Sequence, residues 1–179
     1  MAQMLKIDSE VSTAASPSRV PWTRYRRILW PTDLSPLSMA ALPHALGLAE
    51  TYGAELALFR VLPALARYAV PDMTDGLLES AFEDRRVAAR EQLRKIQAGV
   101  PCRVGTHVLV AEGVSPYRQI VEAARRLHCD VIVLATHGRT GLWHALLGST
   151  VADVIRHTTC LVLTVPSTAP RAVVDLQAA

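Results

Sequence analysis

The clearest chemical pattern in the chain is a set of glycines and hydroxyl side chains that follow a short apolar run. The run 131–135 (VIVLA) is mostly β-branched and apolar, which is typical of a buried parallel strand. The polar loop after it contains Gly138, and Gly148-Ser149-Thr150 opens the next apolar-periodic segment. Glycines let the backbone approach a ligand closely, and the free N–H groups at a helix start attract anions. We therefore expect this strand, loop and helix start to hold a phosphate group.

Two common phosphate-binding motifs do not account for this pattern. A P-loop has the sequence GxxxxGK[ST], whereas Ser149 follows Gly148 directly, without a lysine. The dinucleotide motif GxGxxG follows the first strand of its fold, whereas the first apolar run here ends in Pro31-Thr32-Asp33. A bound nucleotide would have to be held by a different arrangement of residues.

The elements that position these residues follow from the apolar periodicity. The expected helices begin at two Ser-Pro pairs, at Leu77 and at Gly148-Ser149, since serine caps a helix and proline fits its first turn. The inner face of the last helix is expected to be Val151, Val154 and Ile155. A loop over 62–74 is longer than usual for such a connection, which favours a lid or an insertion. The strands are expected at 27–30, 55–61, 103–110, 130–135 and 160–165, and the helices at 35–52, 77–97, 115–127 and 149–157. This alternation requires an α/β fold, with a parallel sheet and helices on both faces.

The composition narrows the classes of protein to which the chain can belong. The 179 residues have a net charge of +3, and only 5% of them are aromatic. Scattered arginines with few aromatic rings do not favour nucleic-acid binding. No apolar run approaches the roughly 18–20 residues of a membrane span, and residues 1–18 lack the apolar core of a secretory signal. We therefore expect a cytoplasmic protein that binds neither nucleic acid nor a membrane.

The cysteines do not predict a metal site or a disulfide framework. Cys102, Cys129 and Cys160 are far apart and show no CxxC spacing. Cys129 and Cys160 stand at the starts of apolar runs, so we expect both to be buried, reduced thiols.

The motif residues as a set resemble a known family. The pattern 135–138 (ATHG), nine residues, then Gly148-Ser149 is similar to the G-x2-G-x9-G-[S/T] signature of UspA-type universal stress proteins, and of their ATP-binding subgroup. The segments 28–35 (ILWPTDLS), 52–56 (YGAEL) and 160–165 (CLVLTV) look like that family too. The resemblance covers residues 25–166, so residues 1–24 are expected to be a flexible tail and residues 167–179 a short tail.

The resemblance implies a fold and a ligand. The family has a five-stranded parallel sheet in the order 3-2-1-4-5, with helices on both faces, in the Rossmann-like arrangement of the adenine nucleotide alpha hydrolases. Many members bind ATP and others do not, and they are usually homodimers. In this strand order the connections of strands 1 and 4 leave in opposite directions, so a crevice opens at their carboxyl ends. Asp33 and the glycine loop therefore converge on one site, although about a hundred residues separate them.

The resemblance also assigns roles by position. Pro31, Thr32 and Asp33 would line the adenosine, and Asp33 would accept hydrogen bonds from the ribose or the base. The backbone of Val61 would form hydrogen bonds with the edge of the adenine. Residues 135–138 would pass under the ribose and phosphates. Gly148, Ser149 and Thr150 would donate hydrogen bonds to the β- and γ-phosphates of ATP, with or without Mg²⁺. Arg139 would balance the negative charge of the phosphates. The matching positions are Pro31, Thr32, Asp33, Val61, Ala135, Thr136, His137, Gly138, Arg139, Gly148, Ser149 and Thr150.

One residue departs from the family pattern, and three functions stay open. Ala135 replaces the first glycine of the signature, which is a small change at negative φ but costs about 1 kcal/mol or more at positive φ. The leading hypothesis is an ATP-binding regulatory or sensor module of the stress response. The alternatives are an interaction protein of the same fold without nucleotide, and a weak ATP hydrolase.

The sequence favours neither an efficient enzyme nor a monomeric protein. No catalytic residue is predicted, because neither a nucleophile nor a carboxylate stands beside His137 in the sequence, so slow hydrolysis is the most we expect. A homodimer through the fifth strand is expected, since the unpaired N–H and C=O groups of an edge strand favour pairing.

Overall fold

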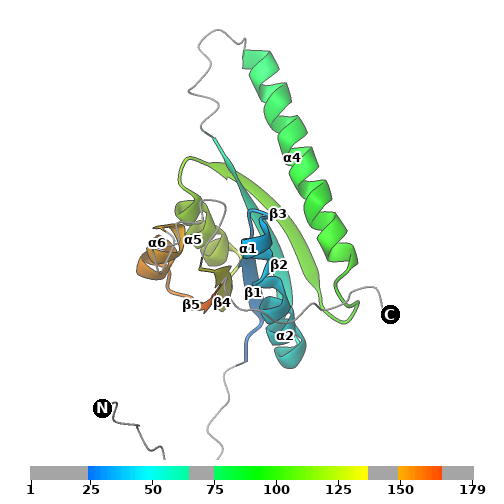
Figure 1. Cartoon of the computed structure of the whole chain (residues 1–179), viewed down its shortest axis with the longest axis vertical. Helices are drawn as coiled ribbons and strands as arrows, with labels where there is room; N and C mark the ends of the chain where they lie inside the picture. The colour runs from blue at the N-terminus through cyan, green and yellow to red at the C-terminus, as the bar shows by residue number, and fades with distance from the viewer. Residues whose placement is uncertain (1–23, 65–74, 137–148, 167–179) are drawn as a thin grey trace, which may run out of the picture.

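The computed structural model describes residues 24–64, 75–136 and 149–166. Their centre is a five-stranded sheet in which every neighbouring pair of strands is parallel (Figure 1). The strand order is β3-β2-β1-β4-β5, which confirms the predicted topology. The strands are β1 (Arg27–Pro31), β2 (Glu55–Pro63), β3 (Thr106–Gly113), β4 (Val131–Ala135) and β5 (Leu161–Val165).

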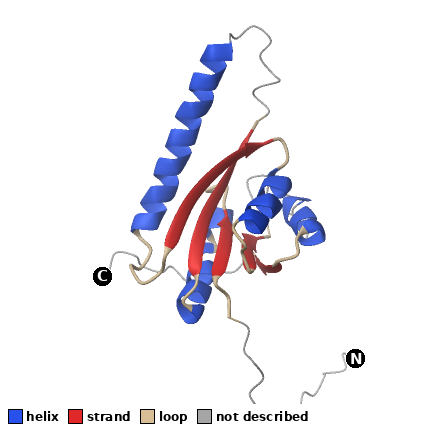
Figure 2. Ribbon diagram, turned by 180° about the vertical axis from the view of Figure 1, so that it is seen from behind, coloured by secondary structure: helices blue, strands red, loops and turns tan. Residues whose placement is uncertain are grey.

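Helices cover both faces of the sheet, as predicted. One face packs against the short helix α1 (Pro36–Met39), α2 (Leu42–Tyr52) and the long α4 (Asp75–Ala98). The opposite face packs against α5 (Pro116–Arg126) and α6 (Ser149–His157). Figures 1 and 2 show α4 on one side of the sheet and the α5–α6 pair on the other.

Two apolar clusters form the core, one on each face of the sheet. Successive strand residues point to opposite faces, so β1 supplies Ile28 and Trp30 to one cluster and Leu29 to the other. The first cluster includes Leu93 of α4 and Ala45 and Ala49 of α2. The second contains Ile120 and Ala124 of α5 and Val151 and Val154 of α6. The sheet is therefore buried on both faces, as its nearly continuous apolar strands predict.

The prediction of a single helix over 35–52 is wrong, because α1 and α2 are two separate helices in that stretch. The break falls at Ala40 and Ala41, just before Pro43 in the first turn of α2. A proline has no N–H, and its ring clashes with the carbonyl four residues earlier, so a proline in the interior of a helix kinks or breaks it. The left-handed Gly53 ends α2, as predicted.

Some predicted boundaries and one predicted core residue also need correction. The third strand begins at Thr106 rather than Arg103, because Val104 N–H donates to Pro101 O at 2.9 Å and closes a turn there. The second strand continues past Val61 to Pro63, which pairs with Gly113 of β3. Ile155 was expected on the inner face of the last helix but is 44% exposed, whereas Val151 and Val154 are buried.

The cysteines largely match their predicted state. Cys129 is buried, Cys160 is half-buried and Cys102 is exposed, and all three are free thiols. Burial raises the pKa of the Cys129 thiol to about 12. Within the described ranges, no three potential metal ligands of the His, Cys, Asp or Glu type cluster together. No helix in those ranges has the length and apolar character needed to cross a membrane.

Candidate functional site

The turn after β1 holds the first three predicted site residues. Pro31 pairs with Phe59 of β2, and Thr32 N–H donates to Phe59 O at 2.9 Å. The Thr32 hydroxyl is buried, lies 2.8 Å from Ser38 Oγ and accepts a hydrogen bond from Leu34 N–H at 3.0 Å. Because the hydroxyl is used inside the turn, Thr32 shapes the site rather than presenting its side chain to a ligand.

Asp33 and Leu34 give this turn its unusual backbone. Asp33 Oδ1 accepts a hydrogen bond from Ser35 N–H at 3.0 Å, and Ser35 Oγ accepts one from Ser38 N–H at 3.1 Å as the predicted cap of α1. Leu34 between them has a φ of +63°. A left-handed conformation costs a branched residue about 1–2 kcal/mol, and such strain gathers at ligand sites. The hydrogen bonds of its neighbours hold Leu34 in this conformation.

A hollow of about 490 Å³ opens beside this turn. Asp33, Leu34, Ser35 and Pro36 form one wall, and Arg60 of β2 and Gln92 of α4 form the other. The Arg60 guanidinium donates to Gln92 Oε1 and thereby links β2 to α4 at the edge of the hollow. Neither residue was predicted to belong to the site. Arg60 is a cation inside an otherwise apolar strand, and that signal could have identified it.

Val61 reaches the same edge of the sheet through its backbone. Glu55 N–H donates to Arg26 O, and Phe59 O accepts from Thr32 N–H, both at 2.9 Å. Odd-numbered residues of β2 therefore direct their backbone groups toward β1. The β1–β2 register ends at Pro31–Phe59, so the N–H and C=O of Val61 project beyond the last paired residue of β1.

The strands β1 and β4 separate toward their carboxyl ends. They pair only at Ile28–Val131 and Leu29–Ile132, whereas five pairs join β1 to β2 and five join β4 to β5. This is the point in the strand order at which the connections turn to opposite sides. The carboxyl ends of the two strands are thus the place where a ligand can approach the sheet.

The end of β4 holds the residue that departs from the family signature. Ala135 is the last residue of β4, is 8% exposed and belongs to the core cluster of the α2 and α4 face. The non-glycine residues with positive φ within the described ranges are Leu34 and His128, so Ala135 has an ordinary strand backbone. Thr136 follows, and its N–H donates to Val165 O at 2.9 Å. A methyl group at position 135 therefore causes no backbone strain.

The remaining predicted residues lie around the start of α6. Ser149 is exposed at the first position of this helix, and Thr150 is half-buried beside it. The packing of Val151 and Val154 against the α5 face fixes this end of the helix. The predicted residues that lie outside the described ranges are His137, Gly138, Arg139 and Gly148. The structure thus brings Pro31, Thr32, Asp33 and Val61 to one edge of the sheet, and the glycine-loop assignments stay predictions.

Comparisons of the sequence and of the structure with known proteins both find universal stress proteins. The sequence matches the Universal stress protein family over residues 24–166. Universal stress protein MJ0531 of Methanocaldococcus jannaschii is 34% identical over 142 residues, which cover 79% of this chain and 82% of that protein. The structure of MJ0577 from the same organism is 27% identical and has a TM-score of 0.64, covering 84% of this chain and 100% of that one. Universal stress protein UspA from Lactobacillus plantarum, at 24% identity, has the same fold with a TM-score of 0.68 over 80% of this chain and 99% of that one.

The family match begins at Arg24, before β1, and ends just after β5, so it includes every strand of the sheet. It includes the turn at Asp33, the end of β4 and the start of α6, which are the elements from which the candidate site is built. The chain belongs to the universal stress protein family.

Proposed function

We propose that this protein binds ATP at the carboxyl edge of its sheet and works as a regulatory module of the stress response. The observation that supports this most directly is the hollow of about 490 Å³ beside Asp33 and Arg60, at the edge toward which Val61 directs its backbone. The family resemblance implies the same ligand on the same residues. Of the described motif residues, Asp33 lines this hollow, and Val61 lies on the same edge of the sheet.

The charges around the proposed site define how ATP would lie. Asp33 carries a negative charge at the end of β1, so it favours the neutral adenosine and its hydroxyl donors over the triphosphate. The start of α6 offers free N–H groups and the positive end of a helix dipole, which favour the phosphates, with or without Mg²⁺. ATP would therefore bind with its adenosine against Asp33 and Val61 and its phosphates against Ser149 and Thr150.

The test is direct measurement of ATP binding by isothermal titration calorimetry, together with mass spectrometry of any ligand that co-purifies. We expect saturable binding to the purified chain and loss of binding in Gly148→Val, because a β-branched residue keeps the backbone away from the phosphates. The matched control is Gly47→Ala, in α2, where an added Cβ meets no atom within 4 Å. Unchanged affinity in Gly148→Val would contradict the site assignment. An empty wild-type pocket would leave the interaction-protein alternative.

We also propose that two copies pair through β5. This strand forms the outer edge of the sheet next to β4, and it exposes Leu161 (57%) and Leu163 (38%) to solvent. An exposed apolar edge strand is an aggregation hazard unless a partner covers it. Light scattering at tens of micromolar should give twice the chain mass for the wild type and the monomer mass for Leu161→Lys. A monomeric wild type would contradict the proposal.

A further inference from the structure

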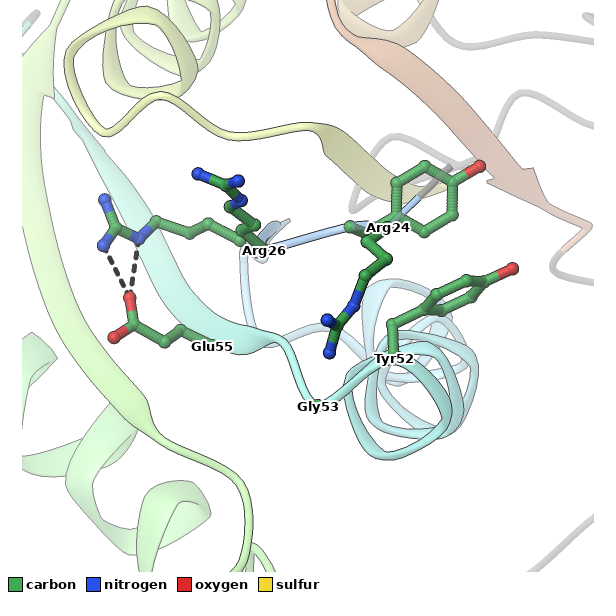
Figure 3. Close-up of a pocket in the computed structure, with 7 residues that line it drawn as sticks. Arg24, Arg26, Tyr52, Gly53 and Glu55 are labelled. Carbon is green, nitrogen blue, oxygen red and sulfur yellow. Dashed lines mark hydrogen bonds and ion pairs between the residues drawn. The ribbon is translucent and has the colours of Figure 1, made fainter. Parts of the chain in front are cut away.

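A second hollow, larger than the first, lies at the opposite edge of the sheet. It measures about 690 Å³, and Figure 3 shows it between the start of β1, the end of α2 and the start of β2. Its lining residues are Arg24, Tyr25, Arg26, Arg27, Tyr52, Gly53 and Glu55. Because these residues precede or begin the strands, the hollow belongs to the amino edge of the sheet and is separate from the proposed ATP site.

The backbone around this hollow is fixed by Asp130, which lies just before β4. Its Oδ2 accepts hydrogen bonds from Arg26 N–H at 2.6 Å and from Arg27 N–H at 3.0 Å. On the other side, Gly53 ends α2 in a left-handed conformation, and its N–H bonds back to the last turn. Tyr25 and Tyr52 join the two sides through an edge-on ring contact with centroids 4.6 Å apart. The hollow is therefore part of the folded structure, held by contacts between three elements.

One of its three arginines is fully engaged within the protein. Arg27 donates to Glu55 Oε2 through Nη2 at 2.6 Å and Nε at 2.8 Å, and to Leu127 O through Nη1 at 2.5 Å. Glu55 also lies 3.2 Å from His107 Nε2. The hydrogen bonds from Arg27, and to a lesser extent His107, lower the pKa of the Glu55 carboxyl. The single acid in the lining is thus ionised and already balanced by Arg27.

Among the residues that the structure describes, the other two arginines have no such partner. Arg24 and Arg26 are exposed, and within the described ranges neither side chain forms an ion pair or hydrogen bond. In Figure 3 the Arg24 guanidinium extends toward Gly53 and Tyr52, whereas the Arg26 guanidinium extends to the other side of the segment before β1. Two cations without a charge partner in the described part of the chain therefore border a hollow that has an aromatic pair in its wall.

We propose that this hollow docks an acidic segment of a partner protein. Guanidinium groups match carboxylates as bidentate donors, and the Tyr25–Tyr52 pair gives an amphipathic surface for the side chains between the acids. The volume of about 690 Å³ is far larger than a single ion requires. The net charge of +3 steers acidic partners toward the molecule. Because the hollow and the ATP site occupy opposite edges of the sheet, a partner can dock without covering the nucleotide, and the proposal does not depend on ATP binding.

The test uses fluorescein-labelled octaglutamate as the probe and fluorescence anisotropy of the full chain at low salt. We expect saturable binding that weakens as salt is added. The double variant Arg24→Gln/Arg26→Gln should bind about tenfold more weakly, because it loses two exposed charge pairs with the probe. The matched control is Arg85→Gln/Arg118→Gln, which lowers the net charge equally at exposed arginines of α4 and α5, away from the hollow. We expect the control to bind octaglutamate like the wild type.

Three outcomes would overturn the proposal. Equal losses in both double variants would mean that the probe follows net charge alone. Tighter binding of an eight-nucleotide single-stranded DNA with the same dependence on Arg24 and Arg26 would point to nucleic acid. Complete displacement of the probe by millimolar inorganic phosphate would point to a small-anion site. If Arg24→Gln/Arg26→Gln melts at a lower temperature than the wild type, Arg24→Lys/Arg26→Lys is used in its place. This variant keeps both positive charges but lacks the bidentate guanidinium donors. Its affinity for octaglutamate should therefore lie between those of the wild type and the glutamine variant.

Discussion

Replacing Asp33 by Asn tests the adenosine end of the proposed site with little change to the fold. Asp33 Oδ1 accepts the Ser35 N–H at 3.0 Å, and the amide oxygen of Asn can keep this hydrogen bond. Asn, however, is neutral, and its NH₂ group donates, so it cannot replace a carboxylate oxygen that accepts a hydrogen bond from the ligand. Hydrogen bonds to charged groups contribute about 1.5–3 kcal/mol. ATP should therefore bind about 10- to 150-fold more weakly to Asp33→Asn.

The measurement is calorimetric titration of wild type and Asp33→Asn with ATP, 2′-deoxy-ATP, 3′-deoxy-ATP and inosine triphosphate. If Asp33 accepts a ribose hydroxyl, the analogue without that hydroxyl should bind the wild type about as weakly as ATP binds the variant. Removing both partners should then cost little more than removing one, which is the signature of a direct contact in a double-mutant cycle. A contact with the adenine amino group would give the same coupling with inosine triphosphate instead.

Two results would refute this reasoning. An unchanged dissociation constant for ATP in Asp33→Asn would mean that the carboxylate does not contact the ligand. Additive losses for every analogue would mean that Asp33 acts only through the shape of the turn. The melting temperature separates these cases from damage to the fold, because the Ser35 N–H keeps its acceptor in Asp33→Asn and loses it in Asp33→Ala, which should melt earlier.

Three further predictions follow from the core, the thiols and the ion pairs. Leu93→Ala, at a fully buried position of α4, should lower the free energy of unfolding by about 3–5 kcal/mol in urea titrations, because a cavity is left between the helix and the sheet. Iodoacetamide at about pH 8.5 should modify the exposed Cys102 first and Cys129 only in denaturant, as followed by mass spectrometry, since burial raises the pKa of the Cys129 thiol to about 12. Arg27 holds the pKa of Glu55 below its usual range, so the stabilisation is present above about pH 4.3 and is lost as the pH falls through the lowered pKa. Thermal melts between about pH 5 and 2 should therefore show a smaller loss for Glu55→Gln than for the wild type.

The topology could be predicted because each strand is a short apolar run and each crossover carries its own start signal. Ser35-Pro36 predicts the start of α1, and Ser35 Oγ does cap that helix. Ser115-Pro116 predicts the start of α5 equally well, although no hydrogen bond to the Ser115 side chain caps it. The boundary errors came from local features that the apolar period conceals. Pro43 interrupts a continuous helical stripe, and the turn closed by Val104 lies at the start of the stretch 103–110 that was expected to be a strand.

The sequence assigned some residues of the candidate site, whereas others lie together only in the tertiary structure. The roles of Asp33 and Val61 came from the family resemblance, and they stay predictions. Arg60 and Gln92 lie on different elements, and only the packing of α4 against β2 brings them to one hollow. The amino-edge hollow depends in the same way on the pairing of Arg27 with Glu55 and on the position of Tyr52.

The structure shows what the replacement of the signature glycine by Ala135 does to the backbone. A glycine in a signature has two physical uses, a positive φ or a close approach of ligand to backbone. The first does not apply here, because Ala135 ends β4 with a strand backbone and pairs with Val165. The methyl group also belongs to the buried cluster on the α2 and α4 face, at 8% exposure. Alanine in a strand is favoured over glycine by roughly 0.5–1 kcal/mol, so this position stabilises the end of β4. The substitution therefore causes no strain in the backbone of β4, and the proposed binding of phosphate depends on the residues of the loop that follows.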